Sequence, residues 1–120
     1  MHAEIPEIIG VQDVVSRLGS WPSFHDAEII QVHLEREGHS TVTVRLKGPG
    51  GPGALVTFTF EQILDLTLDG EDVNRQNVIS ALVIERVNQA SKLIFSPCYG
   101  LAGHITAERV SVRIEEIPQN

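Results

Sequence analysis

The chain has 120 residues, the length of one ordinary domain, which is enough to bury a hydrophobic core without disulfides or metals. Apolar residues make up 42%, charged residues 21%, and the mean hydropathy is +0.02, which excludes the composition of a disordered or membrane-embedded chain. Sixteen Asp and Glu against nine Lys and Arg leave a formal net charge of −7, so phosphate backbones would be repelled and direct nucleic-acid binding is not expected.

Cysteine usage and the N-terminus predict a cytoplasmic protein. Cys98 is the single cysteine, so no intrachain disulfide can form, and this count fits a reducing compartment. The first ten residues, MHAEIPEIIG, lack the basic start and the apolar run of a signal peptide. No stretch approaches the roughly 20 apolar residues that cross a bilayer, so no membrane contact is expected. The acidity suits a basic protein partner, or simply keeps the chain soluble.

Residues 8–18 are predicted to form a short amphipathic helix. Gly19 follows, where a helix often ends in a left-handed residue. We expect the apolar face to pack on a sheet, and the alternative is a partner-binding surface. The apolar residues at helical spacing are Ile8, Val11, Val14, Val15 and Leu18.

The stretch from Trp21 to Glu28, WPSFHDAE, connects this helix to the first strand. It holds the only Trp of the chain, and Ser23 and Asp26 have the spacing of a turn or helix-start cap. We therefore predict a structural role for Trp21 and Pro22 as the chain turns from helix into strand.

Alternating apolar and polar residues predict seven strands after this stretch. Their close spacing, the turn residues between them and the single preceding helix predict one mainly β domain over residues 1–120. The expected architecture is an antiparallel β-sandwich or a strongly curled sheet. The predicted strands are residues 29–36, 41–47, 54–60, 63–69, 78–87, 92–96 and 104–116.

Three features of this strand pattern are irregular. Residues 78–87 lack strict alternation, which predicts a strand covered on both faces. The glycine-containing segments 48–53 and 97–103 are predicted to be loops. In the last strand the parity of the apolar residues changes near Glu108 and Arg109, which predicts a β-bulge there.

His25, Asp26 and Glu28 are the candidate chemical residues of the connecting stretch. If the chain is already extended here, neighbours point to opposite faces, so His25 and Asp26 cannot hydrogen-bond as a base and its orienting acid do. Asp26 and Glu28 would then share a face near the mouth of the core, as an acid/base pair or a metal contact. Capping and turn roles explain the same residues more simply.

The remaining reactive side chains do not form an obvious site. His25 and His33 are eight residues apart, roughly 26 Å along a straight strand, and no pair of His or Cys has zinc-ligand spacing. Cys98 could be a nucleophile if His25 or His104 reached it, but a lone cysteine is more often a small buried apolar residue. Tyr99 is expected to anchor its loop, with its hydroxyl near water. No metal and no cofactor are predicted.

Three blocks of sequence together resemble a known family. They are WPSFHDAEI at residues 21–29, DGEDVNRQNVI at residues 69–79 and PCYGLAGHI at residues 97–105. With the strands between them they are similar to the small bacterial immunity proteins encoded beside polymorphic toxins, in particular the family catalogued as immunity protein fifty. The similarity runs from about Leu18 to Pro118, and the middle block has Val73 where the family pattern has an aromatic residue.

The resemblance implies a protein with no reaction of its own, which binds a toxin domain and blocks its active site or its access to substrate. An acidic surface would suit a basic toxin, such as a nuclease domain. Contact residues do not carry over, because inhibitory surfaces in such families follow the toxin. The candidate binding residues are His25, Asp26, Glu28 and Tyr99, and the candidate structural residues are Trp21, Pro22, Asn77, Gly100 and Gly103.

A small hydrolase or ligand-binding β-sandwich is the alternative. Its site would be built from His25, Asp26 and Glu28, with Cys98 or Tyr99 drawn in from the second glycine-containing segment. Such a protein should have a concave pocket that joins these groups. An inhibitory protein should instead use them as scaffold and present an acidic face to its partner. The oligomeric state is open in both cases.

Overall fold

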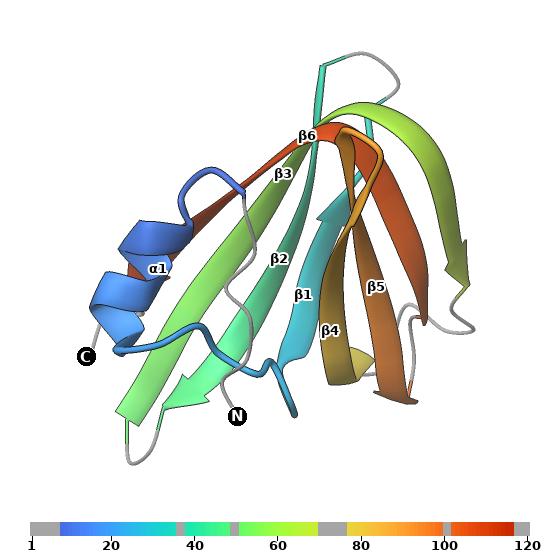
Figure 1. Cartoon of the computed structure of the whole chain (residues 1–120). Coiled ribbons are helices and arrows are strands. Elements are labelled where there is room, and N and C mark those ends of the chain that lie inside the picture. The colour runs from blue at the N-terminus through green and yellow to red at the C-terminus, as the bar shows by residue number, and fades with distance from the viewer. Residues whose placement is uncertain (1–7, 36–37, 49–50, 70–76, 100–101, 117–120) are drawn as a thin grey trace.

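The computed structural model describes residues 8–35, 38–48, 51–69, 77–99 and 102–116. Within these ranges six antiparallel strands form one sheet in the order β1-β2-β3-β6-β5-β4, which closes into a barrel, and one helix precedes them (Figure 1). The mainly β fold with one short helix is confirmed, and the sheet is strongly curled. The elements are α1 (Val11–Leu18), β1 (Glu28–His33), β2 (His39–Gly48), β3 (Gly51–Asp69), β4 (Asn77–Val87), β5 (Ala90–Tyr99) and β6 (Ala102–Glu116).

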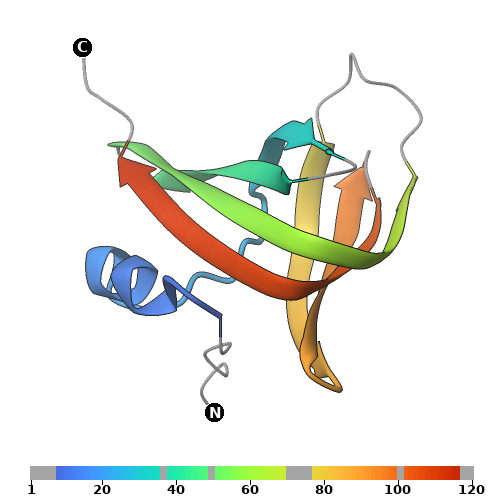
Figure 2. The same cartoon turned by 90° about the horizontal axis from the view of Figure 1, so that it is seen from above.

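The two longest strands, β3 and β6, organise the barrel. They pair from Ala54 opposite Glu116 to Asp69 opposite Ala102, and both bend between these ends (Figure 2). The first half of β3 also pairs with β2, whereas the first half of β6 pairs with β5. β3 and β6 are therefore each paired on both edges over part of their length. The barrel is closed by a short contact between β1 and β4.

The strand count and the two predicted loops need correction. Residues 54–60 and 63–69 belong to one strand, because Glu61 and Ile63 stay paired with β6 while Gln62, with a φ of 60°, turns the chain within the ladder. In the segments 48–53 and 97–103 all of the described residues belong to strands: β2 reaches Gly48, which pairs with Gly51 at the start of β3, β5 reaches Tyr99 and β6 begins at Ala102. Residues 49–50 and 100–101 lie outside the described residues. Glycine permits a loop but does not require one.

The prediction that β4 is covered on both faces is wrong. Val83 and Val87 on this strand are 42% and 40% exposed. Alternation is broken instead by shifts in the register against β5, between Val78 and Ile79 and between Ile79 and Ala81. A β-bulge disturbs the period of two just as burial on both faces does.

The predicted bulge in β6 lies in its neighbour β3. The parity of buried residues in β6 does change, from Ile105 and Ala107 before the bend to Val110 after it. The register shift, however, is between Ile63 and Asp65 of β3, opposite Ala107 and Thr106. Leu64 is the extra residue.

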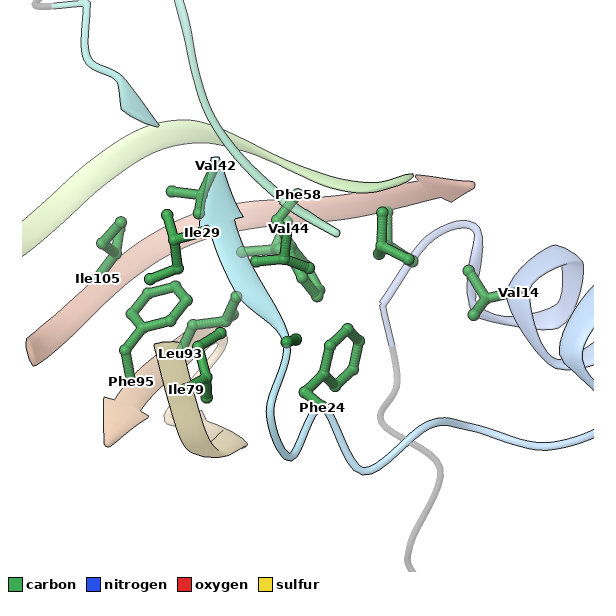
Figure 3. Close-up of a cluster of buried hydrophobic side chains, with 14 of the residues drawn as sticks. Val14, Phe24, Ile29, Val42, Val44, Phe58, Ile79, Leu93, Phe95 and Ile105 are labelled. Carbon is green, nitrogen blue, oxygen red and sulfur yellow. The ribbon is translucent and has the colours of Figure 1, made fainter. Parts of the chain in front are cut away.

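The core fills the barrel and extends under the helix. In the first half of β3 alternate residues from Ala54 to Phe60 are buried, as expected for β-branched and aromatic residues on one face of a strand. Val11 and Val14 of α1 join this core beside β6, so the predicted packing of the helix on the sheet is confirmed (Figure 3). No helix in the described ranges is long and apolar enough to cross a bilayer.

Candidate functional site

The connecting stretch is anchored in the core by its aromatic residues. Phe24 is 1% exposed, and its ring centroid lies 5.4 Å from that of Trp21 and 5.7 Å from that of Phe58. Figure 3 shows Phe24 and Phe58 within the core. Trp21 and Pro22 are half-buried. Aromatic pairs at such distances add to the stabilisation that burial alone provides. The stretch is therefore packed against the barrel and does not cross its surface as a free loop.

Hydrogen bonds then join this stretch to the start of β4. The backbone N–H of Asp26 donates to the carbonyl of Ile79 over 2.8 Å, and the N–H of Ile79 donates to the carbonyl of Ala27 over 2.8 Å. His25 Nδ1 lies 3.0 Å from the carbonyl oxygen of Ser80. Because a carbonyl oxygen can only accept, Nδ1 carries the proton and donates. Residues 25–27 thus extend the pairing of β1 with β4.

His25 and Asp26 do not lie on opposite faces of an extended chain, which corrects the sequence argument. Phe24 and Asp26 have φ values of 61° and 67°, so the chain makes a turn here. As a result His25 Nε2 and Asp26 Oδ1 are 3.6 Å apart. Their side chains are 62% and 68% exposed, so water screens the interaction.

Glu28 lies in a different environment from Asp26. Its side chain is 15% exposed and forms an ion pair with Arg45, the residue opposite it on β2. Asp26 in contrast points into solvent. The two carboxylates therefore do not share one site, and the charge of Glu28 is balanced by a structural partner.

The three blocks that carry the family resemblance meet where the barrel closes. Glu28 of β1 lies opposite Val78 of β4, which lies opposite Tyr99 of β5. Next to this row, Ile29 lies opposite Asn77. The end of the first block, the end of the second and the start of the third are consequently neighbouring strands.

The remaining predicted residues lie at or next to the ends of β4, β5 and β6 in the sequence. The side chains of Asn77, Cys98 and Tyr99, and Gly100 as a whole, lie outside the described residues. Gly103 has a φ of 140°, and a Cβ built on it would lie 1.8 Å from the carbonyl oxygen of Thr67. Only glycine therefore fits this point of contact between β6 and β3 without a shift of backbone.

The other described histidines each lie beside one carboxylate on the outside of the barrel. His33 Nε2 is 2.7 Å from Glu35, and His104 Nε2 is 2.8 Å from Asp65. His39 Nε2 is 2.8 Å from Glu61. In the described part of the chain no group of three or more His, Cys, Asp or Glu side chains is placed to hold a metal.

A shallow cavity of about 420 Å³ lies away from the candidate residues and is lined by parts of β3, β6 and the β4–β5 hairpin. Figure 1 shows β3 and β6 bending near this hairpin. His25, Asp26 and Glu28 take no part in it. Sequence reasoning missed this site, although the parity change at Glu108 and Arg109 marked the bend. We call it the crest cavity; its lining is Leu64, Val87, Asn88, Gln89, Ala90, Thr106, Glu108 and Arg109.

No family model, no curated protein and no solved structure matches the chain.

Proposed function

We propose that this chain is a non-enzymatic immunity protein that binds a cognate toxin domain and neutralises it. The observation that carries the proposal is the position of the three blocks that resemble immunity proteins. They lie together at the closure of the barrel, where the His25 ring of the first block is bound to a backbone carbonyl and Glu28 to Arg45. The three blocks thus serve as scaffold in this proposal, and partner recognition falls to the rest of the surface.

The charge of the chain supports a basic partner. The formal net charge is −7. In the described ranges, four of the cationic side chains are held in ion pairs with carboxylates, so their positive charge is locally balanced. A basic toxin domain would be drawn to the excess negative charge, which raises the association rate and disfavours acidic competitors. The pairs are Arg17 with Asp13, Arg45 with Glu28, Arg109 with Glu61, and Arg113 with Glu115.

One observation favours the alternative, a small hydrolase or ligand-binding protein. His25 has its Nδ1 held by the Ser80 carbonyl, as an oriented catalytic imidazole does, and its Nε2 faces outward near Asp26. The same two side chains are mostly exposed, and the crest cavity does not include them. A catalytic site requires a concave surface that holds substrate beside the base. We therefore rank binding above catalysis.

The proposal expects the reading frame immediately upstream to encode a large secreted protein with a toxic C-terminal domain, and the test is protection against that domain. Co-expression with this chain should restore growth, and the two purified proteins should form a complex on size-exclusion chromatography. A double variant, His25→Ala with Asp26→Asn, removes the acid and base of the catalytic alternative, and it should still protect if recognition lies outside the first block. Continued toxicity with no complex would refute the proposal. Loss of protection by the folded double variant, with a complex still formed, would favour the catalytic alternative.

A further inference from the structure

The crest cavity has two exposed apolar walls. Leu64, at the bulge of β3, is 59% exposed, and Val87 is at the end of β4 beside the hairpin turn. A bulge commonly re-aims a side chain next to a functional site. Gln62, two residues earlier, has left-handed backbone within a paired strand, which persists only where the surrounding structure holds it. The local backbone therefore places a large apolar side chain in solvent beside a concave surface.

The two charged residues of the cavity lining, Arg109 and Glu108, differ in whether they have a partner among the described residues. Arg109 Nε lies 3.5 Å from Glu61 Oε2, and Glu61 Oε1 lies 2.8 Å from His39 Nε2, so the guanidinium has a carboxylate beside it in an exposed pair. Glu108 is exposed and makes no ion pair with any of the residues that the structure describes. Asn88 and Gln89 add amide groups at the turn. Glu108 is thus the charged residue of the lining without a partner among the described residues, and Leu64 and Val87 supply apolar surface.

We propose that the crest cavity receives a lysine or arginine side chain of the toxin domain. The aliphatic stem of such a side chain would lie along Leu64 and Val87, and its cationic end would reach Glu108. Long cationic side chains pair an apolar stem with a charged head, which matches this combination of walls and carboxylate. The inference rests on the proposed function, because the partner is the toxin domain of that proposal.

The affinity of charge and wall variants for the purified toxin domain tests the inference. By isothermal titration calorimetry, Glu108→Lys should raise the dissociation constant roughly 100-fold, because it puts a cation opposite the incoming cation. Leu64→Ser should raise it about tenfold through lost contact with the stem. The matched control is Glu115→Lys, a charge reversal on the same strand outside the cavity, which should change it less than about threefold. Circular dichroism melting checks that each variant is folded.

The outcomes separate the two proposals. If the wild type binds the toxin domain and Glu108→Lys and Leu64→Ser bind like Glu115→Lys, the crest assignment is wrong and the immunity function stands. If the wild type does not bind, both proposals fall. If Leu64→Ser instead converts a dimer of this chain into monomers without weakening toxin binding, the cavity is an interface between copies and the assignment is also wrong.

Discussion

Replacement of Phe24 measures how firmly the connecting stretch is held against the barrel. Phe24→Ala removes a fully buried ring that contacts Trp21 and Phe58. Truncation of a buried Phe costs about 3–5 kcal/mol, which includes the cavity left behind. With a urea slope of about 2 kcal/mol per molar for a domain of this size, the midpoint should fall by roughly 1.5–2.5 M.

The backbone conformation at Phe24 gives a second prediction, which compares glycine with alanine at this position. Because its φ is 61°, a side chain of any kind is strained here, and glycine is not. Phe24→Gly should therefore be no less stable than Phe24→Ala, and up to about 1 kcal/mol more stable, which reverses the usual order of these two residues. Urea unfolding followed by far-ultraviolet circular dichroism, with Trp21 fluorescence as a second probe, measures both. A loss below about 1.5 kcal/mol in Phe24→Ala, or a glycine variant clearly weaker than the alanine variant, would refute the reasoning.

Three further predictions concern Gly103, Glu28 and the effect of salt on association. Gly103→Ala should lower the free energy of unfolding by at least about 2 kcal/mol, because the new Cβ meets a backbone carbonyl. The control Gly19→Ala, also at positive φ but with open space around it, should lower it by only about 1 kcal/mol. Equal losses in urea unfolding would contradict the steric argument. Glu28→Ala should cost about 1 kcal/mol by removing the partner of Arg45 from a pair that is only partly buried, and a neutral effect on thermal unfolding would count against the structural role of Glu28. The association rate with the toxin domain should fall steeply between low and physiological salt in stopped-flow measurements, and a salt-independent rate would argue against steering by the acidic surface.

The fold was largely predictable because its strongest signals are local. The spacing of Val11 and Val14 indicated the helix face that packs on the sheet, and Gly19 indicated where the helix ends. Most strands followed from alternation. The merged β3 was not predictable, since the left-handed Gln62 that lets one strand continue around the bend has no sequence signature. Glutamine is an unusual residue for that conformation.

The site was less predictable, because its geometry depends on contacts between distant segments. The turn that brings His25 beside Asp26 needs left-handed backbone at Phe24, which a bulky residue adopts only when its packing fixes it. Likewise the crest cavity arises where the β4–β5 hairpin meets Glu108 of β6, and only the register of the whole sheet sets that meeting. The sequence pattern indicated the bend but not the cavity beside it.

Hydrogen–deuterium exchange on the complex with the toxin domain tests most directly whether the shared blocks are scaffold and recognition lies elsewhere. Our account predicts slower exchange on binding at residues 87–90 and 106–109, with little change at residues 24–28, where the connecting stretch is already hydrogen-bonded to β4. Slowed exchange confined to residues 24–28, with the crest unaffected, would contradict it.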